Sequence, residues 1–323
     1  MIVFRMSTIL VALLALAAGH ALAQNYPSKP VRIVVPFPPG GTVDVLTRII
    51  APKISEQLNQ PVIVDNRGGA GGAIGTNAVA KSDPDGYTVL LTPNGLAVAP
   101  AVFKKLPYDP ANDFAPVTQL ISTVFILASN PALPVASVKE LVALAKAKPG
   151  SLNYGSNGVT DPLQLTMELF KLSAGVDIVP IVYKGVAPLN TALLAGEVPL
   201  AIMPLSITVP SVKSGRLRAL GVTSTQRTAV LPEVPTIAEA GIAGFESVGW
   251  QGLFVPAKTP RAVIERLNQE AVRALNAPDV RERIIASGQE PVGGTPEQFE
   301  ARFRADLAKF ARIVQEARIP PQD

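Results

Sequence analysis

The 323-residue chain carries 29 basic and 25 acidic residues, no cysteine and one histidine, and 48% of it is hydrophobic. The lack of cysteine excludes disulfides, thiol nucleophiles and thiolate metal sites, and no basic run interleaved with aromatic residues marks a nucleic-acid surface. The length and the hydrophobic share favour two lobes built from buried parallel strands covered by helices.

The first segment has the pattern of a secretory signal peptide over residues 1–23. Arg5 is a short basic flank, residues 8–18 are apolar, and Ala21-Leu22-Ala23 has the form of a cleavage site. His20 lies inside this segment, so the mature chain would also lack a histidine base and a histidine-bound metal. With no cysteine to carry a lipid anchor, we expect an exported periplasmic protein that is not lipid-anchored.

An anion-binding corner is predicted after the first strand. Val31–Val35 is a short β-branched run, and the turn that follows contains Gly40-Gly41, which have no Cβ to keep a ligand away from the backbone. Thr42 is positioned to cap the next helix, and Asp44 falls in its first turn, where a carboxylate suits the positive end of the helix dipole. The free N–H groups of this helix start would face an anion at the carboxyl end of the strand.

The rest of the chain repeats a strand–loop–helix rhythm, which is typical of parallel sheets in an α/β fold. Strands are predicted over residues 61–65, 87–91, 152–154, 178–183, 200–203 and 218–222. Helices are predicted over residues 73–81, 137–148, 162–173, 186–195, 260–275, 280–286 and 296–316, the last three packing on the first lobe. A further helix is expected after the loop at residues 92–95. Loops at the strand ends are expected over residues 155–161, 184–188 and 204–208.

Two apolar segments, 117–128 and 248–255, are predicted to cross between the lobes. We therefore place lobe one at residues 24–122 and 249–323 and lobe two at residues 123–248. Two crossing segments make a natural hinge, and closure around a ligand is the motion expected of such a protein.

Three helix starts carry capping signals. Ser137 precedes Glu140 by three residues and Thr295 precedes Gln298 by three, which is the spacing of a capping box. Asp161 stands before Pro162, a pairing typical of the N-cap and first position of a helix.

The chain resembles the tripartite tricarboxylate transporter receptors, also called the Bug family of periplasmic solute-binding proteins. The resemblance covers essentially the whole mature chain and rests on five motifs in order: Pro36-Phe-Pro-Pro-Gly-Gly-Thr-Val-Asp44, Val64-Asp-Asn-Arg-Gly-Gly-Ala-Gly-Gly72, Pro84-Asp-Gly-Tyr87, Tyr154-Gly-Ser-Asn-Gly158 and Val182-Tyr-Lys-Gly185. It implies an α/β, two-lobed type II (Venus-flytrap) fold in which each lobe is a mostly parallel sheet flanked by helices. It also implies a small carboxylate ligand and delivery to the membrane permease subunits of a transporter. We expect a monomer with no catalytic residue, cofactor or metal.

By match of motif, the resemblance implies ligand contacts from loops of both lobes. The lobe-one candidates are Phe37, Pro38, Gly40, Gly41, Thr42, Asp44, Gly69, Ala70 and Thr92. The lobe-two candidates are Ser156, Asn157, Gly158, Thr160, Asp161, Lys184, Gly185, Pro204 and Leu205. Neither Asp44 nor Asp161 is a clear partner for an ammonium group, so a plain organic acid is favoured over an amino acid.

Several of these residues also have a purely structural interpretation. Asp161 is most simply an N-cap, and Lys184 is most simply a solvated strand-end lysine. The run Gly69–Gly75 is similar to a dinucleotide fingerprint, but no acidic residue follows at the required distance, so close helix packing beside a pocket wall is favoured. Arg67 is expected to pair with a neighbouring acid, and Trp250 is expected in the core.

Two alternative functions remain open at this point. Ser156 and Lys184 could form the nucleophile pair of an exported hydrolase, although only the residue types favour it. The protein could also be a solute sensor for a signalling system, with no permease to feed.

Overall fold

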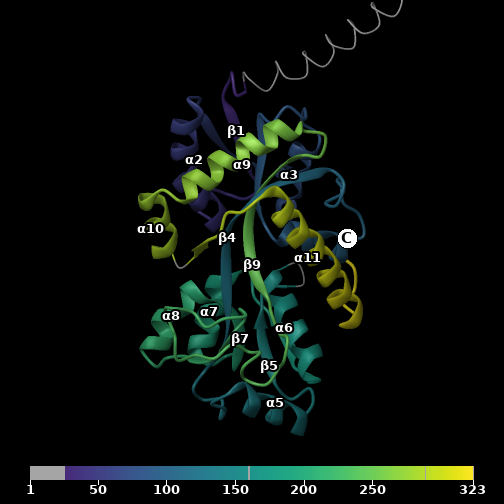
Figure 1. Ribbon diagram of the computed structural model, residues 1–323. Coiled ribbons are helices and arrows are strands. Elements are labelled where there is room, and N and C mark those ends of the chain that lie inside the picture. Colours follow the sequence, from purple (N-terminus) through teal and green to yellow (C-terminus); the bar gives the residue numbers. More distant parts are fainter. Residues whose placement is uncertain (1–25, 159–160, 288, 323) are drawn as a thin grey trace, which may run out of the picture.

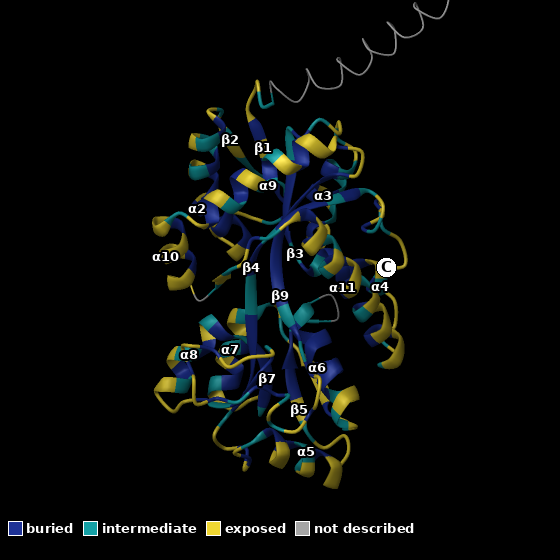
Figure 2. Cartoon of the chain, viewed as in Figure 1, coloured by how far each residue is buried: buried dark blue, intermediate teal, exposed yellow. Residues whose placement is uncertain are grey.

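Two long antiparallel strands, β4 (Phe114–Ser129) and β9 (Val248–Pro256), run side by side from one lobe of the molecule into the other (Figure 1). The computed structural model describes residues 26–158, 161–287 and 289–322, so the predicted signal peptide lies outside the described residues. Both strands are buried along most of their length (Figure 2). The two predicted crossing segments are therefore confirmed, and they form one continuous sheet with the strands of both lobes.

The first lobe contains a parallel set of strands in the order β2-β1-β3, and β3 joins β9 in the antiparallel sense. The strand bounds are β1 (Val31–Val35), β2 (Val62–Asn66), β3 (Thr88–Pro93) and the short β10 (Glu290–Pro291), which pairs with β4. The helices are α2 (Thr42–Leu58), the 3-10 turn η1 (Ala70–Gly72), α3 (Ala73–Ala80), α4 (Gly95–Val102), α9 (Arg261–Leu275) and α10 (Pro278–Ala286). Apart from Arg32, the residues of β1 are all buried, as expected of a parallel strand covered on both faces.

The second lobe repeats the arrangement on the other half of β4. Its strands are β5 (Asn153–Ser156), β6 (Val179–Val182), β7 (Leu200–Pro204) and β8 (Arg218–Val222). Its helices are α5 (Val138–Ala147), α6 (Pro162–Ala174), α7 (Val186–Ala195) and α8 (Leu205–Lys213). The outer strands β7, β5 and β6 are parallel, whereas β7 and β8 both pair with β4 in the antiparallel sense. The predicted α/β fold of two lobes is confirmed, with parallel outer strands and antiparallel pairing at the centre.

The C-terminal helix α11 (Pro296–Glu316) contacts both lobes, because it packs on α4 and β4 and also on α6. The sequence predicted packing on the first lobe alone. The capping box at its start is confirmed, with Thr295 and Gln298 each accepting a hydrogen bond from the other's backbone N–H. Trp250 of β9 is 1% exposed and meets Phe299 of α11 edge-on at 5.1 Å between ring centroids, so its predicted core role is also confirmed.

Helix α4 follows the third strand, where a helix was expected after the loop at residues 92–95, whereas helix α8 was not predicted. Helix α8 begins at Leu205, directly after β7, where the sequence predicted a loop over residues 204–208. Leu205 and Thr208 are buried there, and the Thr208 hydroxyl donates to the backbone oxygen of Pro204 at 2.9 Å. Tertiary packing of this first turn outweighs the low helix propensity of Thr208 and of Pro210 inside the helix.

None of the helices in the described ranges combines the length and apolar content that a membrane crossing requires.

Candidate functional site

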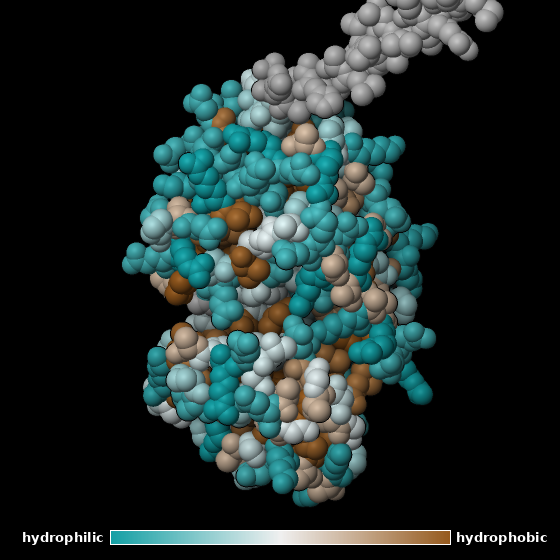
Figure 3. Space-filling view, in the orientation of Figure 1, coloured by the Kyte–Doolittle hydropathy of each residue, from teal (hydrophilic) through white to brown (hydrophobic). Residues whose placement is uncertain are grey.

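A cavity of about 760 Å³ lies between the two lobes and is lined by residues of both. Lobe one contributes most of the wall, through the starts of α3 and α4 and the loop over residues 103–108. Lobe two contributes Asn157, Asp161, Pro162 and Gly185. On the face seen in Figure 3, apolar surface also gathers where the two lobes meet. A cavity of this size is in the range of small-molecule binding sites.

Three helices start at the cavity wall without a side-chain cap. The wall includes Gly72, the N-cap of α3, Gly95, the first residue of α4, and Gly185, the N-cap of α7. In the part of the chain that the structure describes, none of the three N-cap residues makes a side-chain cap, although the Ala73 N–H of α3 donates to the backbone oxygen of Ala70. The first N–H groups of a helix have no partner inside the helix, and the dipole makes that end positive. The wall therefore presents several donors suited to one anionic group.

The backbone at two of these starts requires glycine. Gly72 has φ 96° and Gly185 has φ 114°, values that residues with a side chain rarely adopt. A Cβ at Gly185 would meet open space, so the requirement there is conformational and not steric. The N–H of Gly72 donates to the backbone oxygen of Gly69 at 3.0 Å, so the protein itself occupies that group.

Charge is sparse on the cavity wall. Among the described lining residues, Lys105 is the only basic one and Asp161 is the only acidic one. Asp161 is the N-cap of α6, as predicted, and its Oδ1 accepts from the Leu163 N–H at 2.8 Å. Burial raises the pKa of Asp161, although the hydrogen bonds from Leu163 and from the Asn157 amide act in the opposite direction.

The Gly40-Gly41 corner differs from the prediction in one respect. Thr42 does not cap α2, because Gly41 is the N-cap and no side chain caps this helix. Asp44 instead reaches back from the first turn, and its buried carboxylate accepts from the Gly40 N–H at 2.8 Å. That N–H group is therefore occupied by the protein itself.

Asp44 also binds two neighbouring side chains. Its carboxylate accepts from Arg48 Nε at 3.0 Å and from Asn66 Nδ2 at 3.0 Å. Burial raises the pKa of Asp44, but the donors from Arg48, Gly40 and Asn66 outweigh it and hold the pKa below its usual value. Asp44 thus stabilises the corner.

Ser156 lies beneath the surface of the second lobe. It is 1% exposed, and its Oγ donates to Gln164 Oε1 at 2.5 Å and accepts from the Gly158 N–H at 2.9 Å. Lys184 is exposed, and no contact between Ser156 and Lys184 occurs in the part of the chain that the structure describes. A Ser-Lys nucleophile needs the two groups in hydrogen-bond reach, so the geometry does not support the hydrolase alternative.

The predicted site residues divide into three groups. Those on the cavity wall are Phe37, Ala70, Thr92, Asn157, Asp161 and Gly185. Those outside the wall are Pro38, Gly40, Gly41, Thr42, Asp44, Gly69, Ser156, Gly158, Lys184, Pro204 and Leu205. Thr160 lies outside the described residues. Ligand contact by any of these residues stays a prediction.

Two further predictions about this region are confirmed. A Cβ at Gly75 would lie 2.6 Å from the backbone oxygen of Arg67 and 2.8 Å from the Cα of Pro36, so this glycine allows close packing of α3 on β1. The side chain of Arg67 pairs with Asp65 at 2.8 Å and has the structural role expected of it.

The sequence did not predict part of the lobe-one wall. Asn77 from α3 and the loop residues Lys105, Leu106 and Tyr108 all line the cavity. The only local signal for the loop is its run of lysine and proline after a predicted strand–helix unit. Nothing in that run shows which side chains line the cavity.

Two α/β lobes, joined by two crossing strands and enclosing a shared cavity, define a solute-binding protein of the periplasmic type. The chain matches the family described as "Tripartite tricarboxylate transporter family receptor" over residues 46–319, and it belongs to that family. It is 38% identical to protein BugT of Bordetella pertussis over 301 residues, which cover 93% of this chain and 92% of BugT.

Two solved structures show the same fold. "R. palustris Rpa4515 with adipate" has a TM-score of 0.78 and 35% identity, covering 92% of this chain and 100% of that chain. MatC from Rhodopseudomonas palustris "with bound malate" has a TM-score of 0.74 and 30% identity, covering 90% of this chain and 100% of that chain. Members of this family are periplasmic solute receptors and not enzymes, and this chain is a receptor of that class.

Proposed function

We propose that this protein captures a small organic carboxylate in the cavity between its lobes and delivers it to the membrane subunits of a tripartite tricarboxylate-type transporter. The observation that carries the proposal is the meeting of three uncapped helix starts, those of α3, α4 and α7, at one cavity. Their N–H groups can bind a carboxylate without a paired cationic side chain.

The relatives support this assignment. Rpa4515 is described with adipate and MatC with malate, and both of these ligands are dicarboxylates. The remainder of the cavity wall is largely apolar, including Leu96, Val98 and Leu106, which suits the carbon skeleton of such an acid.

Ligand binding is proposed to couple to lobe closure. The lobes would divide at residues 122/123 and 248/249, inside the long strands β4 and β9. A carboxylate bridging α3 and α4 of one lobe and α7 of the other gains contacts only when the lobes approach, so it favours the closed form. The receptor is proposed to act as an exported monomer, released from its signal peptide after residue 23 and without a lipid anchor.

Calorimetric titration with mono- and dicarboxylates tests the binding step. Ile74 lies in the first turn of α3 on the cavity wall and is 57% exposed, so Ile74→Asp adds a carboxylate there without disturbing the core. We expect wild type to bind at least one of these acids and Ile74→Asp to bind it at least about tenfold more weakly, because like charges repel at close range.

Ile285→Asp is the matched control, since Ile285 is a 53% exposed isoleucine on α10, outside the cavity wall. It should bind as wild type does. Equal weakening by both variants, or no binding of any acid by wild type, would contradict the proposal.

Delivery to a permease needs a separate test in cells. Deletion of the receptor should abolish uptake of the acid that binds, and the wild-type copy should restore it. Intact uptake together with a lost transcriptional response to the acid would instead support the sensor alternative.

A further inference from the structure

Two acceptor groups stand together on the lobe-two wall of the cavity. Asn157 Nδ2 donates to Asp161 Oδ2 at 3.1 Å, and both residues line the cavity. This bond fixes the orientation of the amide, because the reverse orientation would set the amide oxygen against the carboxylate. The Asn157 Oδ1 is consequently left as a free acceptor.

The free acceptor is unpaired. Asn157 Oδ1 is buried and has no hydrogen-bond partner among the described residues. Buried polar groups are nearly always paired in folded proteins, and an unpaired one at a binding site is explained by a partner that the ligand supplies. The missing partner of a carbonyl oxygen is a hydrogen-bond donor.

Asp161 adds a second acceptor beside the first. Its carboxylate accepts from the Leu163 N–H at 2.8 Å and from Asn157, and a carboxylate can accept about two bonds more. No Lys or Arg forms an ion pair with Asp161 in the ranges that the structure describes. This wall therefore attracts a hydrogen-bond donor, whereas the uncapped helix starts attract an anion.

We infer that the ligand carries a hydrogen-bond donor, a hydroxyl or an ammonium group, beside its carboxylate, and that Asn157 and Asp161 receive this donor. The inference rests on the proposed function of the cavity and narrows its substrate class to hydroxy- and amino-carboxylic acids. It replaces the sequence-based expectation that a plain acid is favoured over an amino acid.

Matched acids that differ in a single substituent provide the test. Succinate, malate and aspartate share one skeleton and carry hydrogen, hydroxyl and ammonium at the same carbon. Adipate with 2-aminoadipate, and 3-phenylpropanoate with phenyllactate and phenylalanine, extend the series to longer and aromatic skeletons. In the series that binds, calorimetry should show a donor-bearing acid binding at least about tenfold more tightly than the unsubstituted one.

Two variants assign the preference to the two residues. Asn157→Ala should reduce the ratio of the affinity for the donor-bearing acid to the affinity for the unsubstituted acid. Asp161→Asn keeps an effective N-cap for α6 while removing the charge, so it should reduce the preference for ammonium more than that for hydroxyl. Asn190→Ala is the control, since Asn190 also has a buried unpaired Oδ1 but lies outside the cavity wall, and it should leave the ratio unchanged.

The two possible failures are distinguishable. Equal binding of plain and donor-bearing acids by wild type would overturn this inference and leave the carboxylate receptor standing. Binding of no acid in any series would overturn the receptor proposal as well. A donor preference that persists in both Asn157→Ala and Asp161→Asn would overturn the assignment to these residues.

Discussion

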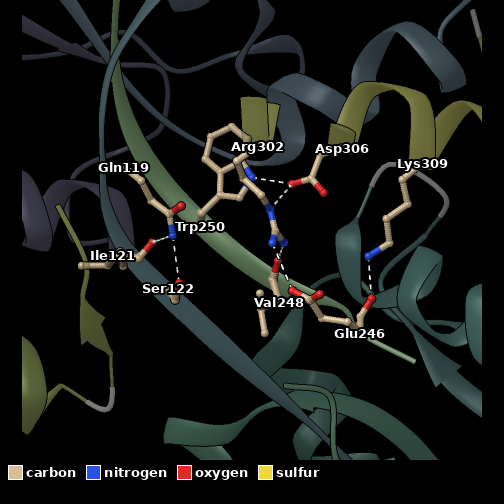
Figure 4. Close-up of polar contacts among 9 residues, drawn as sticks. All are labelled: Gln119, Ile121, Ser122, Glu246, Val248, Trp250, Arg302, Asp306 and Lys309. Carbon is tan, nitrogen blue, oxygen red and sulfur yellow. Dashed lines mark hydrogen bonds and ion pairs between the residues drawn. The ribbon is translucent and has the colours of Figure 1, made fainter. Parts of the chain in front are cut away.

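The indole Nε1 of Trp250 donates a hydrogen bond of 2.7 Å to Oδ2 of Asp306, and both side chains are buried (Figure 4). The same carboxylate oxygen accepts from Arg302 Nε at 3.2 Å, and Arg302 Nη1 reaches Glu246 at 3.1 Å. Lys309 Nζ donates to the Glu246 backbone oxygen at 2.5 Å. Helix α11 is thereby tied both to the crossing strand β9 and to the segment of the chain that enters it.

Asp306→Ala should lower the free energy of unfolding by about 3 kcal/mol, because it leaves a buried indole N–H and the Arg302 guanidinium without their shared acceptor. Urea denaturation measures the change. Glu300→Ala is the control on the same helix, where Glu300 pairs with Arg304 on the surface, and it should cost less than about 1 kcal/mol. Similar losses of unfolding free energy in both variants would show that the Trp250–Asp306 hydrogen bond contributes no more to stability than a surface ion pair.

Gly75→Ala should lower the free energy of unfolding by about 2 kcal/mol, because its Cβ would lie within 3 Å of backbone atoms on two other segments. Gly95→Ala is the matched control, since a Cβ there meets nothing within 4 Å and the residue starts a helix. Its stability should change by less than about 1 kcal/mol. Thermal or urea unfolding of both variants tests the contrast, and equal stability of the two would contradict the close packing of α3 on β1.

The contribution of Asp44 to stability should disappear in acid. The pKa of Asp44 is lowered in the folded state, so its stabilising effect is present above the unfolded pKa and is lost as the pH falls through the folded pKa. Asp44→Asn should therefore cost about 2 kcal/mol near neutral pH and progressively less toward acid pH. Asp83→Asn, in an exposed loop, is the control. A loss that stays the same at every pH would contradict an ionised role for Asp44.

Asp161 should show the opposite dependence. Its pKa is raised in the folded state, so the folded protein binds the proton more readily than the unfolded chain, and the resulting stability is present in acid and lost as the pH rises through the folded pKa. Without ligand, Asp161→Asn should be at least as stable as wild type near neutral pH. As the pH is lowered, the free energy of unfolding of wild type should rise relative to that of Asp161→Asn. Urea denaturation across the acid range measures this, and a shift in the other direction would show that Asp161 is stabilised as the ion.

Local signals made much of the fold predictable. Asp161 with Pro162, and Thr295 with Gln298, each encode a helix start within a few residues, and both starts are where they were expected. Helix α8 was missed because Pro204 and Pro210 are poor local indicators of a helix that tertiary packing stabilises. For helix α4 a helix was expected but not its bounds, because Gly95 at its start and Pro100 inside it are poor local indicators of a helix.

The cavity wall was less predictable than the fold. Gly185 and Asn157 follow strands, and a parallel sheet brings its strand ends together, so their place on the wall was foreseeable. Lys105 was missed, whereas Lys184 was expected, although both are lysines in connecting loops. Which of the two faces the cavity depends on how the loop over residues 103–108 packs, and that packing involves residues far apart in sequence.

A crystal structure of the protein with the acid that binds most tightly in the calorimetric series tests the central claim most directly. The account predicts a ligand between the lobes, with a carboxylate oxygen within hydrogen-bond distance of the first N–H groups of α3, α4 or α7. A carboxylate bound elsewhere on the molecule, or held in the cavity away from all three helix starts, would contradict it.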